Sequence, residues 1–196
     1  MTGTDKQGFY FIGIIPPEPV YSEIRDFQEQ ISNKWNSKEA LRRPVHITLL
    51  HPFHLAGNRE PELIKFLERF AADKKKLSLA IDGFGSFSIG VIYASIVPTT
   101  ELKELEKDLS LSVQRKFQLQ KEKGPSYGFN PHITIGYKDL SPQVFDSAWA
   151  EFKEKLYRRK WTADSISLLR HDGKEWKVVL EAKFESPSSD TLSMDL

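Results

Sequence analysis

The feature that most constrains the fold is an order of elements that occurs twice. Residues 9–15 and residues 93–97 are short apolar runs rich in β-branched and aromatic residues, and each is closed by a proline. An amphipathic helical pattern, a polar loop, a second proline and a strand with His-Ile-Thr follow each run. The first proline lies 30 positions before His46, and its counterpart lies 34 positions before His132. Two copies are too few for a solenoid, so the pattern favours a duplication that builds one domain.

The repeated order predicts both the fold class and its boundaries. We expect an α+β fold: a bilobal, pseudo-symmetric duplication in which two antiparallel sheets face a central cleft and helices pack outside. A single domain should span 1–196, with approximate repeat halves 9–88 and 89–184. Asp172-Gly173 predicts a hairpin between the last two strands. The Ser-rich residues 185–196 are expected to be a disordered tail.

The periodicity also predicts individual elements. Phe84 to Phe87 is interpreted as a turn between two strands because it contains glycine and serine. Trp161 and Trp176 are expected in the core. The spacing predicts helices over 18–35, 63–70, 102–117 and 144–156, and strands over 9–15, 45–50, 77–83, 89–97, 131–135, 164–170 and 176–184.

Composition excludes several classes of protein. The chain has no cysteine, which rules out disulfides, a thiol nucleophile and zinc sites built from thiolates. With 28 Lys and Arg against 27 Asp and Glu, the formal charge of +1 does not suit a long stretch of nucleic acid. Any nucleic-acid contact should therefore be short, such as a chain end or a nucleotide. No apolar run is long enough to span a membrane, and we expect a cytoplasmic monomer.

The two tetrads that begin at His46 and His132 are the strongest functional signal. From this chain's composition, about 0.01 His-aliphatic-Thr-aliphatic tetrads are expected by chance, and two are present. The strand period of two places His46 and Thr48 on one face and their aliphatic neighbours on the other. His132 and Thr134 have the same relation. A lone pair of this kind is usually structural, but two at equivalent places favour one shared cleft with two imidazoles and two hydroxyls.

This set of groups suits chemistry at phosphorus. A neutral imidazole can take a proton from an attacking water, and a protonated imidazole can supply one to the leaving oxygen. The threonine hydroxyls can hold the other phosphate oxygens. No cofactor is required for these steps.

Further residues are candidates for substrate binding. Arg42 and Arg43 precede the first tetrad and could reach a phosphate, although a solvated loop end fits them equally well. Tyr127 and Phe129 lie in a loop on which a base could stack. Phe129 could equally fill the core beside the proline that follows. Tyr137 follows the second tetrad and is assigned to the same site.

A metal site at His46, His51 and His54 is the weaker alternative. His51 has the opposite strand parity to His46, and Pro52 is expected to end the strand before His54. We therefore predict no metal ligands in this chain.

The two tetrads, in this order, resemble the 2H phosphoesterase superfamily, and the resemblance extends from Phe9 to Phe184. Within it the chain is most similar to the group known as 2'-5' RNA ligase or RNA 2',3'-cyclic phosphodiesterase. The resemblance implies metal-independent hydrolysis of a cyclic phosphate at an RNA or nucleotide end. It also implies that His46 and His132 are catalytic and that Thr48 and Thr134 bind phosphate.

The chain departs from that group beside each motif. Many members have an arginine shortly after the second motif, where this chain has Gly136-Tyr137-Lys138. They have a Phe-Leu-Gly-like stretch after the first, where this chain has His51-Pro52-Phe53. A 2'-5' oligonucleotide phosphodiesterase or ligase, and a non-catalytic binder of phosphorylated RNA ends, remain alternatives. Two retained histidines favour an enzyme over a binder.

Overall fold

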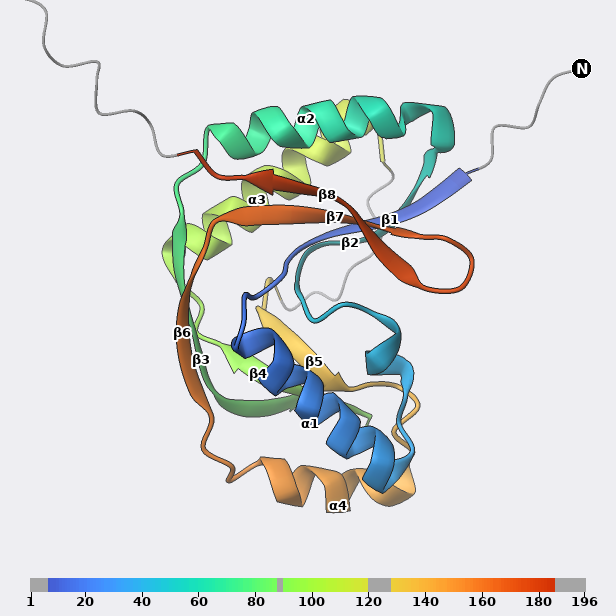
Figure 1. Cartoon of the computed structure of the whole chain (residues 1–196), viewed down its shortest axis with the longest axis vertical. Helices are drawn as coiled ribbons and strands as arrows, with labels where there is room; N and C mark the ends of the chain where they lie inside the picture. The colour runs from blue at the N-terminus through green and yellow to red at the C-terminus, as the bar shows by residue number, and fades with distance from the viewer. Residues whose placement is uncertain (1–6, 88–89, 120–127, 186–196) are drawn as a thin grey trace, which may run out of the picture.

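Two four-stranded antiparallel sheets form the framework of the protein (Figure 1). The computed structural model describes residues 7–87, 90–119 and 128–185. The first-motif sheet has the order β2-β1-β7-β8, and the second-motif sheet has the order β5-β4-β3-β6. The strands are β1 (Gln7–Ile14), β2 (Ile47–Ala56), β3 (Leu77–Phe87), β4 (Val91–Ile96), β5 (His132–Gly136), β6 (Arg158–Ala163), β7 (Ser165–His171) and β8 (Trp176–Lys183). The predicted α+β class and pair of antiparallel sheets are therefore confirmed.

The helices cover the sheets in an exchanged arrangement. Helix α1 (Val20–Trp35) follows a strand of the first-motif sheet but packs on β5 and on α4 (Pro142–Phe152). Helix α3 (Thr100–Phe117) follows a strand of the second-motif sheet but packs on β2, beside α2 (Glu60–Ala72). Figure 1 shows α2 and α3 together at one end of the molecule and α1 and α4 at the other. Two short 3-10 helices, η1 (Glu39–Arg42) and η2 (Gly57–Arg59), flank β2.

The two lobes do not coincide with the two halves of the sequence. Strand β3 belongs to the half 9–88, but it pairs with β4 and β6 in the second-motif sheet. Strands β7 and β8 belong to the half 89–184, but β7 pairs with β1. The Asp172-Gly173 hairpin joins β7 to β8 as predicted. Each sheet thus combines strands from both halves of the sequence. The repeat halves 9–88 and 89–184 remain a prediction from the sequence pattern.

Periodic burial explains why α1 forms and where it docks. Ile24 and Ile31 on its inner face are fully buried. On its outer side Glu23 accepts two bonds from Arg159 of β6, at 2.6 and 2.7 Å, and one from the Tyr157 hydroxyl at 2.8 Å. These bonds lower the pKa of the Glu23 carboxyl, because they favour its charged form. The helix is therefore held to the second-motif sheet by both apolar packing and hydrogen bonds.

Several predicted boundaries were wrong. The segment Phe84 to Phe87 is not a turn, because β3 continues to Phe87. Position 85 requires glycine because the ring of Tyr93 packs against it, and a Cβ there would lie 2.6 Å from that ring. Helix α4 ends at Phe152, and Leu156 beyond it is 87% exposed. The predicted tail from 186 onward lies outside the described residues.

Two features of the sheets were also missed. Strand β6 was not predicted, since its Arg-Arg-Lys start resembles a solvated loop; charged residues are normal on an edge strand, and β6 is one. Strand β2 runs through Pro52 to Ala56, which an edge strand tolerates because the missing N–H costs no ladder bond there. Trp161 and Trp176 are buried, as expected. No helix in the described part of the chain is both long and apolar enough to cross a membrane.

Candidate active site

The two histidine tetrads meet in one cleft between the sheets. Strands β2 and β5 are edge strands of their respective sheets; the second tetrad lies within β5, and the first begins at His46, immediately before β2. His46, Thr48, His132 and Thr134 all line this cleft. The neighbours Ile47, Leu49, Ile133 and Ile135 are buried. The expected division, with polar groups in the cleft and aliphatic groups in the core, is what the structure has.

The imidazole of His46 is fixed by its own backbone and by an aromatic ring. Its Nδ1 lies 2.7 Å from the carbonyl oxygen of Pro44, and its ring packs on Phe11 with a centroid distance of 4.5 Å. A carbonyl only accepts hydrogen bonds, so Nδ1 carries the proton and Nε2 is left as the free nitrogen. Gly13 permits the close approach of β1 to β2 beside this ring, since a Cβ on it would lie 2.6 Å from the Ile47 carbonyl oxygen.

His132 is held in the same way. Its Nδ1 lies 2.8 Å from the carbonyl oxygen of Asn130, again two residues earlier in the chain. Its ring packs against Phe87 at 4.8 Å and Tyr93 at 5.1 Å between centroids. The same tautomer follows, so both histidines have Nε2 free for proton transfer.

Burial and nearby cations favour the neutral form of both imidazoles. Desolvation lowers the pKa of His46 to about 4, with Arg43 and His132 contributing through their charges. Desolvation also lowers the pKa of His132, with a further contribution from His51. In the free protein at neutral pH, each ring is therefore a proton acceptor at Nε2.

Arg43 brings a guanidinium to the cleft, whereas Arg42 does not. The Arg43 guanidinium lies over the ring of Tyr137 at 5.3 Å and near the ring of Trp176 at 5.8 Å. Arg43 and Tyr137 both line the cleft, so the fold brings these predicted site residues together. Arg42 instead pairs with Glu39 at 2.8 Å and is largely exposed. The solvated-loop interpretation fits Arg42, and the phosphate-site interpretation fits Arg43.

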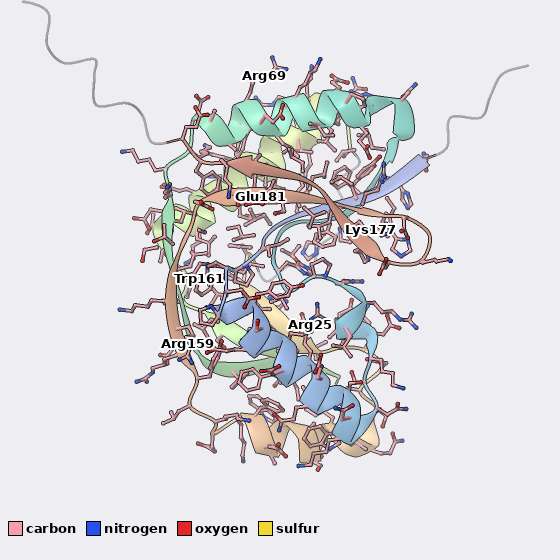
Figure 2. The ribbon with its side chains drawn as sticks, in the orientation of Figure 1. Arg25, Arg69, Arg159, Trp161, Lys177 and Glu181 are labelled. Atoms are coloured by element: carbon pink, nitrogen blue, oxygen red, sulfur yellow. The ribbon has the colours of Figure 1, made fainter. Side chains whose placement is uncertain are left out.

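The segment that carries Arg43 is held from two directions. Arg25, which Figure 2 labels on α1, donates to the carbonyl oxygens of Leu41, at 3.2 Å, and Arg43, at 2.9 Å. The carboxylate of Asp139, from the loop after β5, accepts from the Ser37 hydroxyl at 2.7 Å and from the amides of Lys38 and Glu39. Sequence reasoning missed Arg25 and Asp139, since contacts between segments distant in the sequence leave no local pattern.

His51 lies in the cleft, contrary to the predicted parity. The pairing of β1 with β2 shifts register twice, between Ile12 and Gly13 and between Tyr10 and Ile12, and each shift places an extra residue on β2. The shift between Gly13 and Ile12 falls before His51, so Leu49 and Leu50 are both buried and His51 returns to the cleft side as an exposed residue. Strand alternation cannot reveal this position, because a bulge resets it.

The remaining candidates lie elsewhere. His54 stacks on Phe9 at 4.5 Å and is not part of the cleft lining, so the sequential set of three histidines is divided. Within the described residues, no group of three or more His, Cys, Asp or Glu is arranged to hold a metal ion. Phe129 packs on the main core, which supports its core interpretation. Tyr127 lies outside the described residues.

Gln28 of α1 was also missed. It is 3% exposed and lines the cleft, and its side-chain amide donates to the carbonyl oxygen of Thr134 at 2.9 Å. The bond connects α1 directly to the second motif. Buried glutamine on an amphipathic helix is an unusual choice, and that polarity is the one sequence signal that could have indicated it.

A family model described as the 2'-5' RNA ligase superfamily matches residues 16–175. The chain belongs to this superfamily. The matched range contains both tetrads, which agrees with their resemblance to the 2H phosphoesterases.

Relatives agree with the assignment. A protein of Geobacillus sp. (strain WCH70), named as a candidate phosphoesterase, is 28% identical over 162 residues, which are 82% of this chain and 86% of that protein. A similarly named protein of Bacillus pumilus is 27% identical over 149 residues, 75% of this chain and 82% of its own length. Phosphoesterase chemistry is what the superfamily and these relatives support.

The fold is shared with solved structures of low sequence identity. TT0787 of Thermus thermophilus matches with a TM-score of 0.63 at 16% identity, covering 91% of this chain and 98% of that chain. Escherichia coli LigT complexed with 3'-AMP matches with a TM-score of 0.62 at 18% identity, covering 92% and 100%. At these identities the comparison concerns the fold.

Proposed function

We propose that this protein hydrolyses a 2',3'-cyclic phosphate at an RNA or nucleotide end without a metal ion. The observation that carries the proposal is the pair of imidazoles held alike, each with Nδ1 bonded to a backbone carbonyl and Nε2 free, in one cleft. LigT has been crystallised with 3'-AMP, a ribose phosphomonoester like the proposed product, and with phosphate.

In the proposed reaction a water oxygen attacks phosphorus while one imidazole Nε2 takes the water proton. The bond between phosphorus and one ribose oxygen breaks, and the other histidine, protonated at Nε2, donates its proton to that oxygen. The product is a ribose phosphomonoester with a free neighbouring hydroxyl. Thr48 and Thr134 donate hydrogen bonds to the non-bridging oxygens, whose negative charge makes such bonds strong.

Arg43 supplies the fixed positive charge of the site. A guanidinium can donate two parallel hydrogen bonds to a phosphate, and the rings of Tyr137 and Trp176 restrict the position of this one. Such a group stabilises the charge that develops on the phosphate oxygens. Burial, together with the charge of Arg43, lowers the pKa of His46 to about 4, which favours its neutral form. We therefore propose His46 as the base and His132 as the acid. We further propose a cytoplasmic monomer, since one chain supplies both motifs of the cleft.

The test is incubation of the protein, dialysed against EDTA, with a short RNA ending in a 2',3'-cyclic phosphate. We expect a monophosphate end, identified by mass and by comparison with 2'- and 3'-phosphate standards. The double variant His46→Ala/His132→Ala, purified in the same way, controls for contaminating ribonuclease. Activity that depends on an added divalent ion would contradict the metal-independent mechanism.

A linear 2'-5' dinucleotide serves as the competing substrate. Cleavage of this dinucleotide without hydrolysis of the cyclic end would favour the 2'-5' phosphodiesterase or ligase alternative. Tight binding of the cyclic end without turnover would favour a non-catalytic binder.

A further inference from the structure

His51 is a cleft residue whose placement depends on an irregularity of the backbone. Two register shifts in the pairing of β1 with β2 lie at His51 and just before it, and both add a residue to β2. Bulges next to functional sites commonly serve to re-aim a side chain, and the shift just before His51 turns it from the core side to the cleft. The same shift buries Leu49 and Leu50 in succession, which interrupts the alternation of buried and cleft-facing side chains along β2.

Both ring nitrogens of His51 are available to a ligand. Within the described residues no hydrogen bond involves them, whereas His46 and His132 each use Nδ1 for a backbone carbonyl. The ring is exposed and lines the same cleft as the two motif histidines. His51 is therefore not needed to complete any internal network of the described structure.

The two basic side chains of the cleft lie near different members of the histidine pair. Arg43 is close enough to His46 to lower the pKa of that ring, while His51 acts in the same way on His132. His51 lies three residues beyond Thr48 on β2, but the register shift between them reduces this span to less than two residues of β1, roughly 6 Å at the usual rise of a strand. A phosphate held by Thr48 and Arg43 thus leaves His51 for a different group of the substrate.

We propose that His51 forms a second phosphate-binding subsite, which selects substrates carrying another phosphate on the 5' side of the cyclic phosphate. This proposal rests on the proposed function, because the cyclic phosphate defines where the first subsite lies. Two sources offer the same chemistry: the internucleotide phosphate of an RNA end, and the 5'-phosphate of a mononucleotide. Both place an anion one nucleoside away from the reacting phosphorus.

The test compares kcat/KM for three substrates: adenosine 2',3'-cyclic phosphate, its 5'-phosphorylated form, and a dinucleotide with a cyclic end. We expect His51→Ala to lower kcat/KM about 10-fold or more for substrates with the second phosphate, and less than about 2-fold for the first. The matched control is His54→Ala, an exposed histidine of the same strand outside the cleft, which should leave all three values unchanged. Loss with the dinucleotide alone would assign the subsite to RNA, and loss with the 5'-phosphate alone would assign it to nucleotides.

A binding measurement separates failure of this proposal from failure of the proposed function. Calorimetry with 3'-AMP and with adenosine 3',5'-bisphosphate requires no turnover. The wild-type protein should prefer the bisphosphate, and His51→Ala should abolish that preference while retaining affinity for 3'-AMP. Equal losses for one and two phosphates, or no preference in the wild type, would overturn the subsite. Preference without turnover would retain the subsite and contradict the hydrolase.

Discussion

The two sides of the cleft share their histidine supports but differ in the length of the motif strand and in the other side chains that they bring to the site. On each side a motif strand lies at a sheet edge, and the histidine Nδ1 bonds to the carbonyl two residues earlier, at 2.7 and 2.8 Å. The first side adds a ten-residue strand with two register shifts, plus Arg43. The second side has a five-residue strand supported from behind by Gln28.

This difference separates two tasks within one site. The duplicated part positions two imidazoles and two hydroxyls, which are the groups that move protons and hold a phosphate. The unduplicated parts bring fixed charge and further contacts. We therefore expect changes to the duplicated groups to affect catalysis most, and changes to the additions to affect substrate preference.

The largest effect is expected from removing either motif histidine. His46→Ala and His132→Ala should each lower kcat by about 10² to 10⁴, since each removes one proton-transfer group. The double variant should be little worse than either single variant, because the two rings act as one unit. Turnover of the cyclic-phosphate substrate measures both effects, and unchanged melting temperatures control for folding. Near-normal activity in one single variant would break the equivalence of the two sides.

The next effect concerns the unduplicated cation. Arg43→Ala should lower kcat/KM by about 10- to 100-fold, because a charged hydrogen bond to phosphate is lost. Arg42→Ala is the matched control, since Arg42 is its neighbour in sequence but pairs with Glu39 outside the cleft. Arg42→Ala should stay within about 2-fold of the wild type. Similar losses in both variants would indicate a general charge effect in place of a specific contact.

The pH profile tests the electrostatics that both sides share. Burial and neighbouring cations lower the pKa of both histidines, so the free protein loses its acid as the pH rises through a value below 6.5. The alkaline limb of kcat/KM should therefore lie below pH 6.5 and fall about tenfold per pH unit. A bound anionic phosphate favours the protonated ring, which should move the limb of kcat upward. A kcat/KM limb above pH 7 would contradict these directions.

The smallest effect is expected from Asp139, which reaches across from the second side to the segment that carries Arg43. Asp139→Ala removes the acceptor for Ser37 and two backbone amides, and similar caps contribute about 0.5 to 2 kcal/mol to the free energy of unfolding. We expect a rise in KM of a few fold with little change in kcat, measured alongside urea unfolding. Asp146→Ala, an exposed aspartate on α4, is the control. A selective fall in kcat would place Asp139 closer to the chemistry than the structure does.

Much of the fold and the centre of the site could be predicted from periodicity. Alternation and helical spacing placed α1, α3, the motif strands and the last hairpin, because their burial is regular. The tetrads predicted that His46 and His132 share a cleft. These features are encoded by residues near one another in the chain.

What could not be predicted depends on contacts across the chain. Gly85 resembled a turn residue because its reason, space for the Tyr93 ring, lies on another strand. His51 was assigned to the wrong face because the register shifts are set by pairing with β1. Asp139 and Arg25 hold the Arg43 segment from distant parts of the chain. Sequence patterns report local burial, and these positions are decided by tertiary partners.

The exchange of α1 and α3 between the sheets has a consequence for how the protein folds. The helices that follow β1 and β4 do not cover the sheets to which these strands belong, since α1 packs on β5 and α3 packs on β2. A chain with only one sheet assembled would expose the surface meant for a helix still attached to the other. Stability is therefore gained by both lobes together, and a single cooperative unfolding transition follows, with no stable half-molecule along the way.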